Sequence, residues 1–302
     1  MKNALKYYYN LDIKIIHQKN KTFYFTYEGF DYILKNYDNI EEIDMIYELA
    51  NNLNVKGIYS HQIILNNDRH ILTKINENNY ILLKIFIKKE KIKINDILQF
   101  NNINYSTEHQ KLKRDNWDEL WTQKIDYLEY QVNQIGKKYP LIRKSFSYYI
   151  GLAENALILF KNTPKEKVKL SLSHRRILEN DNKQDLYNPL NMIIDIRIRD
   201  ICEYFKSCFF NNKNIINEVN TYLYYNKLNY NESCYFIARM LFPTYYFDIY
   251  EKIINNEIDE DRLNNIISKV NDYEIFIKNI YINLKSNNNI PDIEWLIKIN
   301  QY

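Results

Sequence analysis

Glycine is scarce in this chain of 302 residues. Only four are present, Gly29, Gly57, Gly136 and Gly151, and no two are close enough to form a glycine-rich phosphate loop. The motifs G-x-G-x-x-G and G-x-x-x-x-G-K-[ST] are therefore absent, and both need the close backbone approach that glycine permits. The nucleophile elbow G-x-S-x-G is also absent. These absences exclude the usual dinucleotide-binding fold and the P-loop NTPases.

Cysteines and long apolar runs are also few. The three cysteines are an odd number, and no C-x-x-C is present: Cys202, Cys208 and Cys234. This pattern favours small buried core residues in a reducing compartment over a disulfide framework or a zinc site. No run of about 18 apolar residues occurs, so we expect no membrane insertion. The first residues lack the apolar stretch of a signal peptide.

The charge is nearly balanced. There are 41 Lys and Arg residues against 38 Asp and Glu residues, which gives a net charge of +3. Because this excess is too small to produce an extended positive field, we expect no nucleic-acid partner. Apolar residues make up 46% of the chain and charged residues 26%, as in globular proteins, so a disordered chain is excluded.

The first 87 residues have the period of strands. Residues 22–35 alternate with a period of two on both sides of Glu28-Gly29, which predicts a hairpin. Residues 41–53 place their apolar side chains on one helical face. Further strands are expected at 12–17, 61–65, 70–75 and 80–87. The pattern therefore predicts three strands, one helix and three more strands.

The rest of the chain has the period of helices. Helices are expected at 115–135, 145–160 and 196–210, with four or five more after residue 214. We predict an α+β protein with a small antiparallel β lobe containing one helix, residues 1–86, and a larger helical lobe, residues 87–302. A short hairpin near 188–195 is expected within the second lobe. This arrangement suits a two-lobed protein-kinase-like fold, and other α+β folds as well.

Three segments carry a resemblance to a known family. They are SYYIGLAENA at 147–156, LSHRRI at 172–177 and NPLNMIIDIRIRDICEY at 188–204. In this order and spacing they resemble the YutH-type spore-coat-associated proteins, relatives of the CotS coat family and of aminoglycoside and choline phosphotransferases. The resemblance extends from about residue 6 to about residue 296 and is strongest over 117–204. It implies a protein-kinase-like fold, in agreement with the order of strands and helices.

The resemblance also implies a nucleotide site with ATP and Mg²⁺ as its cofactors. Lys35, at the end of a predicted strand, resembles the lysine that holds nucleotide phosphates. Glu48, on the following helix, is the candidate ion-pair partner of that lysine. Leu83 and Ile85 lie where the family has the hinge between its lobes.

The catalytic loop departs from the pattern of active kinases. His174, Arg175 and Arg176 stand where related enzymes have His-Gly-Asp or His-Arg-Asp. A guanidinium stays protonated, so Arg176 cannot accept the proton of a substrate hydroxyl. Asp195 follows three apolar residues and is the candidate metal ligand. The alternative for Asp195 is a salt bridge to Arg175, Arg176 or Arg197.

Two functions remain open. One is a pseudokinase that acts as a binding or scaffold protein, synthesised in the cytoplasm and located in the spore coat with other coat proteins as partners. The other is an active ATP-dependent phosphotransferase on a small hydroxylated substrate, with Asp181 or Asp185 as the base. Asn188 and Asn191 are the nearest candidates for a second metal ligand in the active form.

Three further expectations concern the surroundings of this loop. Lys35, His174 and Asp195 should converge at the border between the lobes. The stripe of Trp117 and Trp121 is expected to be core packing. An ion network on the surface of a helix is expected among Arg197, Arg199, Asp200 and Glu203. Arg199 and Glu203 are four residues apart, the spacing of an ion pair on one helical face.

Overall fold

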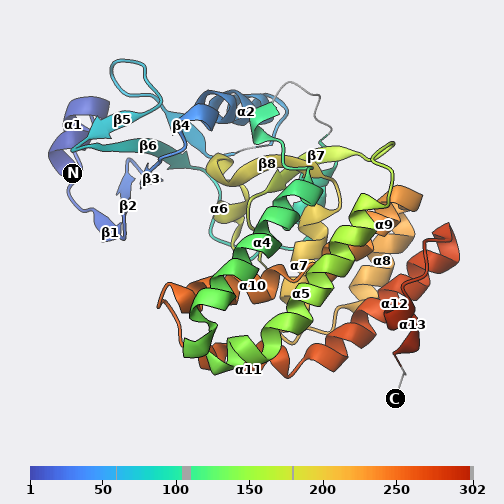
Figure 1. Ribbon diagram of the computed structural model, residues 1–302. Coiled ribbons are helices and arrows are strands. Elements are labelled where there is room, and N and C mark those ends of the chain that lie inside the picture. Colours follow the sequence, from blue (N-terminus) through green and yellow to red (C-terminus); the bar gives the residue numbers. More distant parts are fainter. Residues whose placement is uncertain (59, 104–109, 179, 300–302) are drawn as a thin grey trace.

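The computed structural model describes residues 1–58, 60–103, 110–178 and 180–299 (Figure 1). The first part is an antiparallel sheet with strand order β1-β2-β3-β6-β4, and β5 also pairs with β6. The larger remainder is mostly helical, so the expected α+β class is confirmed. The elements of the first part are α1 (Lys2–Tyr9), β1 (His17–Lys19), β2 (Thr22–Tyr27), β3 (Phe30–Asn36), α2 (Ile43–Val55), β4 (Gln62–Ile64), β5 (Thr73–Ile75) and β6 (Asn78–Ile85).

The sequence predicted the central elements of this part better than its beginning. The β2–β3 hairpin is confirmed, and Gly29 at its turn has a φ of +78°. The expected strand at 12–17 is wrong, because pairing with β2 begins only at His17. The first part also has a second helix, α1. Leu5 and Tyr9 lie four residues apart on α1, and both are buried against the sheet.

The two faces of the sheet pack against different partners. Leu34 and Leu82 belong to the apolar cluster that includes Leu5 of α1. Ile81 and Leu83 face the other way and pack with α2 in the main core. Because side chains alternate along a strand, Lys35 lies on the face that α2 covers.

The second part surrounds a strand pair with helices (Figure 1). Ser171 of one strand is paired with Asp195 of the other. The expected short hairpin at 188–195 is wrong, because residues 189–191 form a 3₁₀ turn and the strand after them pairs further back along the chain. The elements are α3 (Ile94–Asn101), α4 (Trp117–Ile135), α5 (Pro140–Lys161), β7 (Leu170–His174), α6 (Lys183–Leu186), β8 (Met192–Ile196), α7 (Arg199–Phe210), α8 (Ile216–Asn226), α9 (Tyr230–Leu241), α10 (Thr244–Ile254), α11 (Asn264–Ile267), α12 (Val270–Asn288) and α13 (Glu294–Lys298).

One apolar core is continuous through both parts. It includes Ile46 and Ile81 from the first part and Trp117, Phe160 and Phe236 from the second. The division at residues 86 and 87 therefore stays a prediction. The three cysteines are buried and free, as expected. Within the described ranges, no helix is both long and apolar enough to span a bilayer.

Candidate functional site

His174, the last residue of β7, is a structural residue of the loop. Its side chain is fully buried, with Nδ1 2.6 Å from Oδ2 of Asp200 and Nε2 2.8 Å from the carbonyl oxygen of Leu186. Its ring also packs edge-to-face with that of Phe100. Because both ring nitrogens already face oxygen acceptors, His174 is not free to take a proton from a substrate.

Arg175 connects the loop to the beginning of α2. Its guanidinium donates to Glu42, whose other oxygen accepts from Arg114 at 2.6 Å. The Glu42 side chain is only 7% exposed. The carboxylate that contacts the loop is therefore Glu42, and no sequence motif distinguishes it from Glu48.

Arg176 points outward and pairs with a distant carboxylate. Its guanidinium donates to Asp248 of α10, 72 residues further along the chain, and its side chain is 54% exposed. Asn191 holds the backbone of Arg176 in two directions, through Oδ1 at 3.3 Å and Nδ2 at 2.9 Å. Burial raises the pKa of Asp248. No local signal in the sequence could identify Asp248 as a neighbour of the loop.

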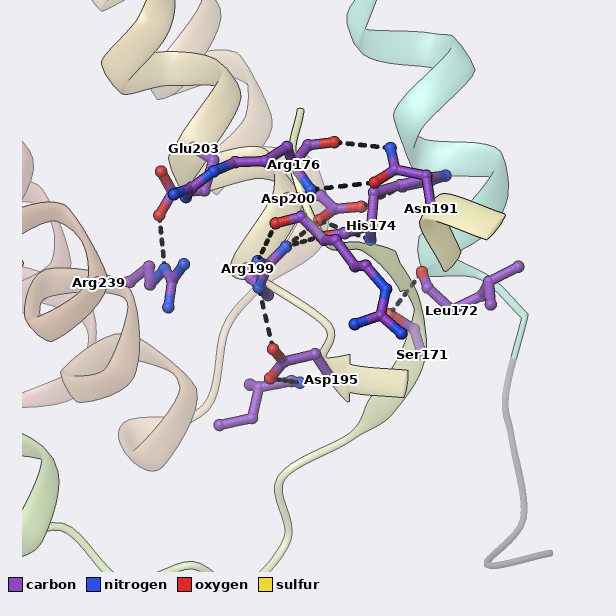
Figure 2. A network of polar contacts seen from close by, with 12 residues as sticks. Ser171, Leu172, His174, Arg176, Asn191, Asp195, Arg199, Asp200, Glu203 and Arg239 are labelled. Atoms are coloured by element: carbon purple, nitrogen blue, oxygen red, sulfur yellow. Dashed lines mark hydrogen bonds and ion pairs between the residues drawn. The ribbon is translucent and has the colours of Figure 1, made fainter. Parts of the chain in front are cut away.

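Asp195 on β8 is enclosed by donors (Figure 2). Its Oδ1 accepts from Nε1 of Trp117 at 2.9 Å and from the backbone N–H of Ile196 at 2.7 Å, and its Oδ2 lies 3.0 Å from Nε of Arg199. The residue is 1% exposed, and burial raises its pKa to about 7 although Arg199 and Arg239 act to lower it. Both carboxylate oxygens are thus engaged within the protein.

The ion pair of Asp195 has a partner that the sequence did not predict. The expected partners were Arg175, Arg176 and Arg197, whereas the observed one is Arg199, four residues further along the chain. The spacing is that of one helical turn, although the chain passes from β8 into α7 between them.

Arg199 holds the two strands and α7 together (Figure 2). Besides Asp195 it donates to Asp200 at 3.0 Å and to the carbonyl oxygens of His174 and Arg175. The predicted surface network on this helix is therefore wrong, because Arg199 and Asp200 are buried. Glu203 does not pair with Arg199.

Three further ion pairs flank this network. Glu203 lies 2.6 Å from Nε of Arg239 and 2.8 Å from Nζ of Lys206, which is itself buried. Arg197 pairs with Glu232 at 3.1 Å. These contacts bring α7 and α9 together, and they place a second arginine close to Asp195.

The side chains expected to bind the metal do not fit Mg²⁺. The ion requires near-octahedral oxygen ligands, and both oxygens of Asp195 already accept hydrogen bonds from the protein. Asn191 is committed to the backbone of Arg176, and Asn188 accepts from the N–H of Leu190 at 3.1 Å. Within the described part of the chain, no group of three or more His, Cys, Asp and Glu side chains could hold a metal ion.

The two carboxylates considered as alternative bases cap local turns. Asp181 accepts from the N–H of Leu178 at 2.6 Å, and Asp185 accepts from the N–H of Asn182 at 3.2 Å. Burial raises the pKa of Asp181. Both side chains therefore stabilise the segment around α6.

The candidate nucleotide residues take no part in the polar contacts around Asp195 that the structure describes. Lys35 and Glu48 are exposed, and no ion pair joins them in the part of the chain that the structure describes. Leu83 is fully buried within β6, and the chain leaves that strand only after Ile85. Ile85 lines a pocket of about 710 Å³ with residues of the β2–β3 hairpin, including Thr26. His174 and Asp195 are brought together through Arg199, whereas the convergence of Lys35 with them stays a prediction.

The segment around α6 covers the chain that follows β6. Gln184 donates through Nε2 to the carbonyl oxygen of Ile87 at 3.0 Å. The N–H of Lys183 donates to the carbonyl oxygen of Glu90 at 2.7 Å, and the N–H of Ile92 donates to that of Asp181 at 3.3 Å. Gln184 also lines the 710 Å³ pocket, so α6 forms part of its wall.

An antiparallel sheet next to a larger helical part that contains the loop at His174 is the arrangement of kinase-like phosphotransferases. Solved structures of that class are similar to it. An aminoglycoside phosphotransferase from Alicyclobacillus acidocaldarius matches with a TM-score of 0.64 and 11% identity, over 91% of this chain and 93% of the other. Spectinomycin phosphotransferase, solved with ADP and spectinomycin, matches with a TM-score of 0.59 and 13% identity, over 93% and 97% of the two chains.

Within that class the particular family is also defined. The chain belongs to the family described as "Spore coat putative kinase YutH", which matches residues 2–280. The endospore coat-associated protein YutH of Bacillus subtilis (strain 168) is 26% identical over 208 residues. That match covers 60% of this chain and 61% of the relative.

Proposed function

We propose that this chain is a kinase-shaped binding protein of the spore coat that transfers no phosphoryl group. Its partners are other coat proteins, and it acts through contacts as a pseudokinase or scaffold. Membership of the YutH family supports the place in the coat, and the contacts of the loop support the loss of activity.

The observation that carries the proposal is the engagement of Asp195. Phosphoryl transfer depends on positioning and on charge stabilisation by metal-bound phosphates. Here the carboxylate expected to bind the metal is enclosed by Arg199, Trp117 and Ile196. Arg176 adds a second defect, because it carries a positive charge where a base is required.

The test is ATP turnover with sugars, amino alcohols and protein acceptors, in the presence of Mg²⁺. We expect no turnover above background, since loss of the base alone costs about 10²–10⁴-fold in rate. The runner-up function is an active phosphotransferase on a small hydroxylated substrate. Turnover on the order of 1 s⁻¹ that disappears in Asp195→Asn would establish that function and refute the pseudokinase. Asp248→Asn then tests whether Asp248 serves as the base.

Nucleotide binding is measured separately from turnover. Lys35, Glu48, Leu83 and Ile85 remain the proposed nucleotide residues, and Ile85 lines the large pocket beside the sheet. A ligand at 1,000 times its Kd stabilises a protein by about 4 kcal/mol, so thermal unfolding with ATP detects binding. A shift with ATP that Lys35→Met abolishes and the exposed Lys19→Met retains would support these residues.

A further inference from the structure

A second, smaller pocket borders Asp195. It has a volume of about 270 Å³ and is lined by side chains of α4, β8, α7 and α9 and of the segments next to α4 and β7. Four of the lining residues are arginines: Arg114, Arg175, Arg199 and Arg239. Nothing in the family resemblance explains so many guanidinium groups around one pocket.

Arg239 has hydrogen-bonding capacity that the protein does not use. Its side chain is 6% exposed, and its Nε is 2.6 Å from Glu203. Its guanidinium carbon lies 4.9 Å from the centre of a Trp117 ring, which holds the group in one orientation. Figure 2 shows the contact of Arg239 with Glu203, and the two Nη atoms of Arg239 make no hydrogen bond to any other described residue. These Nη atoms are therefore available as donors to an acceptor in the pocket.

Arg175 offers further donors at the mouth of the pocket. One Nη atom donates to Glu42, while Nε and the other Nη bond to no described residue. Its side chain is 35% exposed, so a molecule from solvent can reach it. Arg175 and Arg239 therefore present unused donors from two separate elements to the same pocket.

The electrostatics favour an anion. The only carboxylate among the described lining residues is Asp195, and Arg199 already neutralises it at 3.0 Å. The ion pairs around the pocket form three separate groups, which together contain five arginine and lysine side chains and four carboxylates, one positive charge in excess: Arg114 and Arg175 with Glu42, Arg199 with Asp195 and Asp200, and Arg239 and Lys206 with Glu203. Guanidinium forks match the oxygens of phosphate in a bidentate manner.

We propose that this pocket binds a phosphate group through Arg175 and Arg239 without a divalent cation. In this site Arg199 takes the position on Asp195 that a metal would need, and arginines supply the positive charge. The volume corresponds to about nine water molecules at ~30 Å³ each, enough for a phosphate with a short attached group. The proposal deepens the proposed function by naming the ligand class of its site, and it rests on the engagement of Asp195 described there.

The experiment is isothermal titration of the full chain with inorganic phosphate, glycerol 3-phosphate and ATP, each in EDTA and in Mg²⁺. We expect binding of at least one of the first two in EDTA, with an affinity that Mg²⁺ does not increase. The pair of probes distinguishes free phosphate from a phosphomonoester. No binding by either of them, or binding that requires Mg²⁺, overturns the proposal.

Variants assign the binding to the pocket. Arg175→Gln and Arg239→Gln should each weaken it at least tenfold, while Arg143→Gln makes the same change of charge on an exposed face of α5 and should leave it unchanged. If Arg239→Gln does not fold, the variant at the part-exposed Arg175 alone tests whether phosphate binds in this pocket. Equal affinity in Arg175→Gln and Arg143→Gln would refute the site. ATP turnover would refute the pseudokinase whether or not phosphate binds. Failure of the proposed function is therefore distinguishable from failure of the phosphate site.

Discussion

Trp117 is more than a packing residue. The expected apolar stripe of α4 is confirmed, since Trp117 and Trp121 are stacked in the core with ring centres 5.1 Å apart. Only the Trp117 indole reaches Asp195, at 2.9 Å. Hydrophobic spacing predicts which face of a helix is buried, and it carries no information about an indole N–H that bonds a carboxylate 78 residues away.

Replacing Trp117 with Phe should therefore cost more than the same change at Trp121. Both variants lose part of a buried ring, and Trp117→Phe also removes one of the three donors to Asp195. A hydrogen bond to a charged group contributes roughly 1.5–3 kcal/mol, and we expect a difference of that size between the two variants. The measurement is the free energy of unfolding in urea. Equal losses would mean that the bond to Asp195 adds no stability.

His61 should make the protein sensitive to acid. Its side chain is fully buried, neither ring nitrogen has a hydrogen-bond partner in the described chain, and burial lowers its pKa from 6.5 to about 4. In the unfolded chain His61 is protonated below about pH 6.5, whereas in the folded chain it is protonated only below about pH 4. Stability from this residue is therefore complete above pH 6.5 and is lost as the pH falls, by roughly 3 kcal/mol in total.

The variant His61→Leu tests this assignment. Its free energy of unfolding should fall less between pH 7.5 and pH 4.5 than that of the natural chain, because it removes the group that titrates. His70→Leu is the control, since water reaches that exposed imidazole in both states. A pH profile of His61→Leu parallel to the natural one would show that other groups cause the acid loss.

At the scale of elements, the short helix α6 depends on the residue that caps its N-terminus, Asn182. Asn182 accepts hydrogen bonds from the N–H groups of Gln184 and Asp185, and Asp185 bonds back to the N–H of Asn182. With only four residues, α6 has little else to hold its end. This helix also carries the contacts to the chain after β6.

The variant Asn182→Ala should loosen those contacts. The lost cap costs about 1 kcal/mol, and amide exchange should accelerate at Lys183 and at Ile92, which donate across the junction. Asn229→Ala removes the equivalent cap of α9, so it should lower stability without accelerating exchange at Ile92. Unchanged exchange at Ile92 in Asn182→Ala would show that α6 does not hold this junction.

Elements were predicted where one residue period dominates. The β2–β3 hairpin and α4 have clear periods, and both lie where the spacing put them. By contrast, α1 has only two core residues, Leu5 and Tyr9, so its period is too short to recognise. Arg199 was misplaced on the surface for another reason. A polar residue next to a strand is buried only if distant partners satisfy it, and those partners are fixed by the tertiary fold.

At the scale of the whole molecule, Glu42 connects the sheet part with the helical part. It lies just before α2 and accepts hydrogen bonds from Arg114 and Arg175, which both line the 270 Å³ pocket next to Asp195. A phosphate in that pocket would share Arg175 with Glu42. Occupation of the pocket and the contact between the two parts of the molecule are therefore coupled, and each must weaken the other by the same free energy.

The variant Glu42→Gln measures this coupling. A carbonyl oxygen of Gln still accepts from one arginine, while its amide N–H group faces the other, so one guanidinium is released. Stability should fall by roughly 1–3 kcal/mol, because a buried charge-assisted bond is lost and the arginines retain contact with water. Phosphate affinity should rise by about fivefold, since a like charge near the site is worth on the order of 1 kcal/mol. Glu41→Gln, an exposed neighbour, should change neither quantity. If stability falls but phosphate affinity does not change, Glu42 is not coupled to the pocket and only stabilises the contact between the two parts.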